Sequence, residues 1–203
     1  DVLKSRCVAV SLGMASVFFP MVAAVNGGDE VGVGMYTLGD LGFSGFAGSG
    51  IVHMAGASAA LAGVILLGAR KGKYGPNGQT NAIPGANLPM ATLGTFILWM
   101  GWFGFNGGSV LATASVESAN SVAVVFMNTN AAAAGGLIAA LIVARVMFGK
   151  ADLTMALNGA LAGLVAITAE PSTPTALQAT LFGAIGGASG SSTPLPVATK
   201  RVG

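Results

Sequence analysis

The sequence predicts an all-α fold: a polytopic transmembrane bundle of about six spans. The first observation is composition, because 53% of the 203 residues are hydrophobic and only 8% are charged, whereas soluble domains carry roughly 25% charged residues. The second is the recurrence of long apolar stretches, and the third is the abundance of glycine, at 32 residues. Small residues let membrane helices approach closely. This composition excludes a soluble enzyme.

The first expected span is Cys7–Val25, which has about the 20 residues needed to cross a bilayer core. A second interpretation stays open for this stretch. Lys4 and Arg6 followed by an apolar run that ends near Ala24 also resemble a secretory signal peptide.

The next three spans are expected at Phe46–Leu67, Leu88–Leu111 and Ser121–Phe148, and each is long enough to cross the bilayer. Glycine and proline clusters such as Gly75–Gly78 lie between spans and predict loops.

The fifth and sixth spans, Leu153–Thr168 and Thr175–Gly187, are short. A stretch as short as the sixth can also be re-entrant or interfacial. We therefore expect one transmembrane domain over residues 1–187 and a polar, loosely ordered tail over residues 188–203.

The basic residues supply an independent test of the topology. All nine lie at alternate connections: Lys4, Arg6, Arg70, Lys71, Lys73, Arg145, Lys150, Lys200 and Arg201. This alternation satisfies the positive-inside rule for six spans. It predicts an integral protein of the cell (plasma or inner) membrane whose N- and C-termini are cytoplasmic.

Several site classes are absent from the sequence pattern. The net charge of +2 is small and scattered, so no nucleic-acid partner is expected. Cys7 is the single cysteine, which excludes an internal disulfide and a cysteine metal site. No carboxylate pair, metal-ligand cluster or phosphate-binding loop is present, so we expect no enzyme activity, metal or cofactor.

His53 is the single histidine and lies inside the second span. An ionisable group at that depth is costly and suggests function. At helical spacing it shares a face with Gly56, Ala57, Ala60 and Gly63, so the imidazole is expected inside the bundle, where this smooth face packs against another helix. A purely structural interhelical hydrogen bond is the alternative.

Trp102, Phe105 and Ser109 follow i, i+3, i+7 spacing in the third span and should share one face. Aromatic rings attract cations, and a serine oxygen adds an acceptor. Aromatic residues near a span end more commonly form a membrane anchor belt.

The polar residues inside other spans are expected to form interhelical hydrogen bonds. These are Asn128–Asn130 in the fourth span and Asn158 in the fifth. Gly159 and Gly163 have GxxxG spacing, which predicts close helix packing.

Taken together, the motifs resemble the Amt/Rh ammonium transporter family in order and spacing from about residue 8 to residue 187. The stretches that carry the resemblance are Phe46–His53, Leu67–Gly75, Asn87–Met90, Gly101–Ser109, Asn128–Asn130 and Gly163–Thr168. The six spans correspond to the family's fourth to ninth helices, so the chain covers part of that fold.

The resemblance implies two inverted helical repeats plus a final helix, assembled as a homotrimer with a pore through each subunit. His53 would be the first of twin pore histidines and Phe105 one half of an aromatic gate. Trp102 would line the pore nearby, and Ser109 would belong to the outer ammonium-recruitment site. The implied partners are ammonium or ammonia, the lipid bilayer and a cytoplasmic regulatory protein.

The chain departs from the family pattern at three points. It has one histidine where the family has two, Gly45 where the family has an aspartate, and Asn26 where the family has a tryptophan. Glycine is tolerated as a helix N-cap at small cost, so a helix beginning at Gly45 is still expected. These losses leave an alternative open: a non-conducting truncated paralogue that acts as an ammonium sensor or interaction subunit.

Overall fold

The computed structural model describes residues 12–14, 16, 45–81, 83 and 85–192. The chain divides into two compact units, residues 1–68 and residues 69–203, and each is described by itself. The described residues form helices, with one isolated β-bridge between Tyr74 and Thr80 and no strand. The all-α class predicted from the sequence is confirmed.

In the first unit, a π-helical turn leads directly into an α-helix. The turn is η3 (Ser49–Met54), and α4 (Ala55–Leu67) continues it. Gly48 precedes η3 with a φ of 89°, a left-handed conformation that glycine adopts without steric cost. Its carbonyl oxygen accepts hydrogen bonds from the N–H groups of Val52, at 2.8 Å, and His53, at 3.4 Å.

This start corrects the expectation that the helix begins at Gly45. Gly45 is exposed and lies outside the helix, and the N-cap is Gly48. A β-carbon is disfavoured at positive φ, so the chain turns into the helix at a glycine three positions later than the family pattern suggested. The predicted end at Leu67 is confirmed, because Gly68, at φ 69°, terminates α4.

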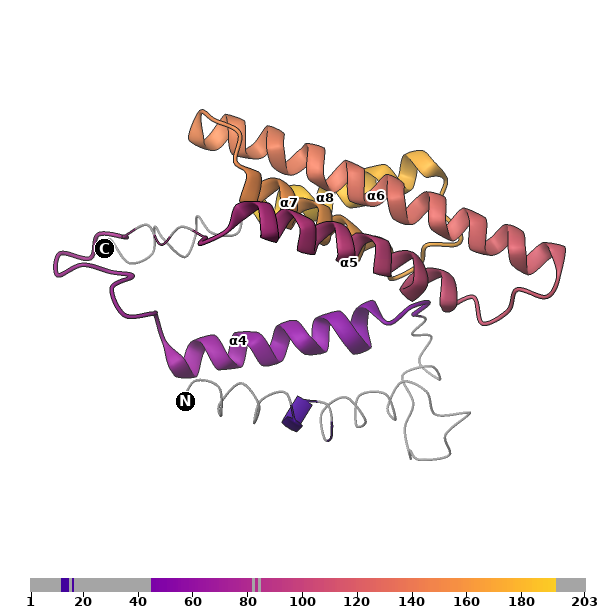
Figure 1. The fold of residues 1–203 in the computed structure, drawn as a ribbon, viewed down its shortest axis with the longest axis horizontal. Helices are drawn as coiled ribbons and strands as arrows, with labels where there is room; N and C mark the ends of the chain where they lie inside the picture. The colour runs from indigo at the N-terminus through magenta and orange to yellow at the C-terminus, as the bar shows by residue number, and fades with distance from the viewer. Residues whose placement is uncertain (1–11, 15, 17–44, 82, 84, 193–203) are drawn as a thin grey trace. The chain divides into compact units, whose positions relative to one another are not determined.

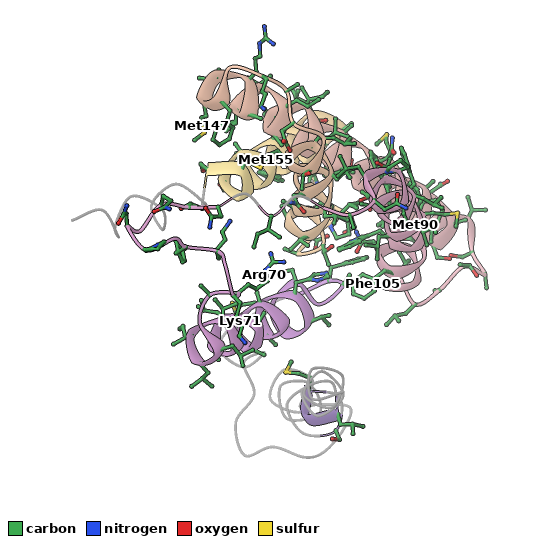
Figure 2. All side chains as sticks on the ribbon, turned by 60° about the vertical axis from the view of Figure 1, so that its left-hand side comes forward. Arg70, Lys71, Met90, Phe105, Met147 and Met155 are labelled. Atoms are coloured by element: carbon green, nitrogen blue, oxygen red, sulfur yellow. The ribbon has the colours of Figure 1, made fainter. Side chains whose placement is uncertain are left out.

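The second unit begins with a basic loop and then α5. Arg70 and Lys71 are exposed in this loop (Figure 2), and Lys73 donates its backbone N–H to the Arg70 carbonyl at 3.0 Å. Helix α5 (Leu88–Gly108) starts at Asn87, whose side chain accepts the Met90 N–H at 3.0 Å. That cap satisfies a backbone donor at the helix start.

Helix α6 (Val116–Phe148) begins five residues earlier than predicted. Ser115 and Ser118 form a capping box, and Gly149, at φ 72°, ends the helix. The 33 residues of α6 extend about 50 Å at the α-helical rise. That exceeds a hydrocarbon core of about 30 Å, so α6 continues beyond the apolar segment.

The last two helices are α7 (Leu153–Ile167) and α8 (Ala176–Ser192). The Asp152 side chain caps α7 by accepting the Met155 N–H at 2.9 Å. Helix α8 runs five residues past the predicted end at Gly187, into the segment predicted to be a polar tail. Its extra residues stay helical because small side chains there pack on neighbouring helices: a β-carbon at Gly190 would contact Ala162 at 3.5 Å.

Helices α6, α7 and α8 pack most extensively against one another, and α5 lies beside α6 and α7 (Figure 1). The contacts between α6, α7 and α8 are made by small residues. A β-carbon at Gly183 or Gly163 would overlap the backbone carbonyl of Ala132, and one at Gly159 would overlap Ala140. The close packing predicted from Gly159 and Gly163 is therefore confirmed.

The distribution of side chains is that of a membrane bundle. The buried apolar residues of the second unit are mainly alanines, whereas large apolar side chains on all four helices are exposed, among them Leu93, Phe96, Ile97, Ile138, Ile142, Leu181 and Ile185. Helices α5 and α6 are each long and apolar enough to cross a membrane. Such an outward apolar surface suits lipid rather than water.

Some predictions fall outside the described residues. Most of the expected span Cys7–Val25, Asn26 and residues 193–203 belong to this group. The number of spans and the order of the tail therefore stay predictions.

The packing predicts that Gly183→Ala destabilises the bundle. The added methyl group would force α8 away from Ala132 on α6, and such overpacking costs about 1–3 kcal/mol. Gly94→Ala is the matched control, because no described atom lies within 4 Å of the added group and alanine favours a helix by up to about 1 kcal/mol. Unfolding of the purified chain by sodium dodecyl sulfate should show a loss of stability for Gly183→Ala but not for Gly94→Ala. Equal stability of the two variants would contradict the packing.

Candidate functional site

Trp102 and Phe105 make an edge-to-face contact near the C-terminal end of α5. Their ring centroids lie 6.0 Å apart with an interplanar angle of 63°. This is a favourable aromatic geometry. Phe105, labelled in Figure 2, is 40% exposed, and Trp102 is half-buried. The i, i+3 spacing therefore brings the two rings together, as the sequence predicted.

Ser109 is the C-cap of α5 and completes this group. Its hydroxyl donates to the Phe105 carbonyl at 2.9 Å. Because the single hydroxyl proton is used there, the lone pairs of Oγ stay available as acceptors. We call Trp102, Phe105 and Ser109 the aromatic–hydroxyl group. It offers ring faces and an acceptor oxygen, the two features that favour a small cation.

A buried threonine holds the indole of Trp102 from a second helix. The indole Nε1–H donates to Thr168 Oγ1 at 2.8 Å, and the Thr168 hydroxyl donates to the Leu164 carbonyl at 2.7 Å. Thr168 is the C-cap of α7 and is fully buried. Sequence patterns gave it no role, because a hydrogen bond between α5 and α7 has no local signature.

Asn106 and Thr129 form the next link between helices. Both are fully buried, and Asn106 Nδ2 donates to Thr129 Oγ1 at 3.1 Å, joining α5 to α6. The predicted interhelical hydrogen bond in the Asn128–Asn130 stretch is thereby confirmed for Thr129. Asn106 Oδ1 has no hydrogen-bond partner within the part of the chain that the structure describes.

Asn128 holds the loop between α7 and α8 against α6. Its fully buried side-chain amide donates to the carbonyls of Pro171, at 2.9 Å, and Pro174, at 2.7 Å. Two carbonyls that no helix satisfies thus receive donors. The partner is a loop rather than a neighbouring helix, which the sequence did not predict.

Asn130 and Asn158 behave differently from Asn128. Both are exposed, and neither side chain forms a hydrogen bond among residues 45–81, 83 and 85–192. Asn130 lies beside an open surface pocket that is lined by Phe96, Trp99, Met100 and Phe103. The expected interhelical hydrogen bonds of Asn130 and Asn158 are thus not found in the described part of the chain.

His53 belongs to the first unit and is half-buried in η3. The face predicted to pack against another helix is open here, since no described atom lies within 4 Å of a β-carbon built at Gly56 or Gly63. Burial of His53 against a second helix therefore stays a prediction. The aromatic–hydroxyl group lies in the second unit, so His53 is a separate candidate.

The described residues contain no cluster of side chains that could coordinate a metal ion. No three of their histidine, cysteine, aspartate or glutamate side chains are grouped so that they could hold an ion. What the second unit does present is an uncharged site of aromatic rings and hydroxyl or amide groups.

Comparison with known proteins places these features in context. The chain matches the Ammonium Transporter Family over residues 9–193. Ammonium transporter Amt2 of Archaeoglobus fulgidus is 49% identical over 142 residues, which are 70% of this chain and 30% of that protein. The ammonium transporter of Bacillus subtilis is 38% identical over 151 residues, which are 74% of this chain and 34% of that protein.

Two solved structures are also similar. The Sensor Amt Protein matches with a TM-score of 0.77 and 39% identity, covering 86% of this chain and 42% of that one. Candida albicans Mep2 matches with a TM-score of 0.70 and 29% identity, covering 86% of this chain and 36% of that one. These likenesses confirm the predicted all-α transmembrane bundle. The chain spans about a third of the length of the curated relatives that it matches.

The two hydrogen bonds of the Asn128 amide predict that Asn128 and Asn130 contribute unequally to stability. Asn128→Leu should destabilise the chain by about 1–3 kcal/mol, because two carbonyls lose their donors. Asn130→Leu, an identical change at an exposed position, should destabilise the chain much less. Thermal unfolding in detergent would compare them. Similar melting temperatures for both variants would mean that the loop does not depend on Asn128.

Proposed function

The chain belongs to the ammonium transporter family, and from this we propose that it forms part of a transmembrane pathway for ammonium or ammonia. Its named relatives are transporters rather than enzymes. The observation that carries the proposal is the aromatic–hydroxyl group at the end of α5, in which the Trp102 and Phe105 rings pack edge to face and the Ser109 hydroxyl bonds to the Phe105 carbonyl.

The physics of the substrate fits such a site. Ammonium pays a large desolvation cost on entering a medium of low dielectric constant, whereas ammonia pays far less. Ring faces and an acceptor oxygen compensate part of that cost by cation–π attraction and a hydrogen bond. We propose that Ser109 recruits the cation, that Phe105 restricts the passage beyond it and that Trp102 lines the path nearby.

His53 is proposed as the proton acceptor along the pathway. It is the single histidine of the chain, and an imidazole exchanges protons near neutral pH. Its place in a π-helical turn supports the proposal, because such turns occur frequently at functional sites.

A second candidate is a non-conducting chain that binds ammonium as a sensor or interaction subunit. One observation favours it: Gly45 supplies no carboxylate where the family pattern has an aspartate. One of the similar structures is named as a Sensor Amt Protein. Under this alternative, Ser109 and the rings would keep their binding role while flux through His53 would be lost.

Topology and partners follow as proposals from the family and the charges. We propose that the basic loop with exposed Arg70 and Lys71 (Figure 2) is cytoplasmic, together with both termini. The chain is proposed to act as a homotrimer in the cell membrane. Its cytoplasmic loops would be available to a regulatory protein.

Ser109→Ala should weaken the binding of methylammonium by about tenfold or more, because a hydrogen bond to a charged group contributes about 1.5–3 kcal/mol. Isothermal titration calorimetry of the chain in nanodiscs would measure the methylammonium affinity. Ser58→Ala is the control, since the Ser58 hydroxyl makes the same kind of bond, to the Met54 carbonyl at 2.8 Å, but belongs to the first unit. Unchanged affinity for Ser109→Ala would remove Ser109 from the recruitment site.

His53→Ala separates the two candidate functions. In liposomes that contain the purified chain, ammonium-dependent current should be present for the native protein and abolished by His53→Ala, because the proton acceptor is lost. Ser58→Ala should conduct normally. Current that survives His53→Ala would assign His53 a structural role, and methylammonium binding without any current would favour the sensor.

A further inference from the structure

We propose that Thr168 is a positioning residue that fixes the orientation of the Trp102 indole in the substrate path; this inference rests on the proposed role of Trp102. Thr168 is fully buried and reaches the indole from another helix, with Oγ1 at 2.8 Å from Nε1. It makes no contact with substrate in this role.

The direction of both hydrogen bonds is fixed by chemistry. The indole has one N–H group and can only donate, so Thr168 Oγ1 must be the acceptor. The Thr168 hydroxyl proton is already committed to the Leu164 carbonyl at 2.7 Å. The threonine oxygen is therefore held with a lone pair toward Trp102, and it cannot rotate away without breaking its own bond to α7.

The backbone beneath Thr168 is anchored as well. Its N–H bonds to the carbonyls of Leu164, at 3.3 Å, and Val165, at 3.2 Å. Pro171, three positions further along, is fully buried and accepts the Asn128 amide at 2.9 Å. Thr168 thus lies on a stretch that is tied to α7 on one side and to α6 on the other.

The consequence for the site is orientational. Cation–π attraction depends on the cation lying over the ring face, and the Trp102 ring meets Phe105 edge-on at 63°. Without the acceptor on Thr168, the indole could turn about its side-chain bonds, and both its face and its contact with Phe105 would change. Thr168 therefore acts on the cation only through Trp102.

The test compares Thr168→Val, which removes the acceptor at nearly constant shape, with Thr168→Ser, which keeps it. Thr95→Val is the matched control, because Thr95 is also largely buried and donates to the Ala91 carbonyl at 3.0 Å but has no bond to an indole. Indole N–H resonances of the chain labelled with ¹⁵N-tryptophan in nanodiscs report the bond directly. Trp99→Phe assigns them, since the chain has two tryptophans.

The Trp102 indole proton should exchange slowly with solvent in the native chain, in Thr168→Ser and in Thr95→Val. Thr168→Val should speed its exchange by about fivefold or more, and should weaken methylammonium binding by about fivefold, the equivalent of one neutral hydrogen bond. Fast exchange in the native chain would overturn the proposal without any variant, so the test survives if Thr168→Val fails to fold.

The two readouts separate this inference from the proposed function. If Thr168→Val leaves the exchange rate unchanged, Thr168 does not position the indole, whatever happens to binding. If exchange accelerates but methylammonium affinity stays constant, Thr168 holds the indole but the link to substrate fails, and with it the proposed place of Trp102 in the substrate path.

Discussion

The second unit depends on the close backbone approach of α6 to α7 and α8. Lipid is as apolar as a leucine side chain, so burying apolar area between helices stabilises a membrane protein little. Close van der Waals packing between the helices has to supply the stability instead. Gly136 shows how closely the backbones approach: an added β-carbon would overlap the Gly159 carbonyl and lie 3.0 Å from the Gly183 carbonyl. Three helices thus meet around positions where no side chain fits, and large apolar residues are left for the lipid-facing surface.

Helix α5 is held partly by different means. It packs less extensively than the other three helices, and beside the ring contact between Phe103 and Phe126 its connections near the candidate site include two polar ones: Trp102 to Thr168 on α7 and Asn106 to Thr129 on α6. A polar group without a partner is costly in the bilayer. Rotating α5 would break both bonds at once, so these side chains fix the orientation of the helix as well as that of the aromatic rings. The residues that orient the site therefore also contribute to the attachment of α5.

Much of this arrangement could be predicted from sequence, and the failures have physical causes. The apolar pattern gave the extents of α5 and α7 closely, and residue spacing brought Trp102 and Phe105 together. It missed the start of α6, because apolarity marks the part of a helix in hydrocarbon, whereas Ser115 caps the helix earlier in a polar stretch. It missed Thr168, since a hydrogen bond between residues 66 positions apart leaves no periodic signal. The π-helical turn after Gly48 likewise follows from backbone geometry that no hydrophobic pattern encodes.

The start of η3 also bears on what Gly45 changes. Gly45 is exposed and lies outside the helix, whose first turn is organised by Gly48, so a carboxylate at position 45 would not be needed as its N-cap. A single imidazole can accept a proton, but passing it on requires a second acceptor, such as water or a group from another segment or chain. The three residues of the aromatic–hydroxyl group, by contrast, all belong to α5 and its C-cap, and Trp102 is bonded to Thr168 in the same unit. The proposed recruitment of the cation and the proposed transfer of its proton therefore depend on different residues, and the first could be retained while the second depends on further groups.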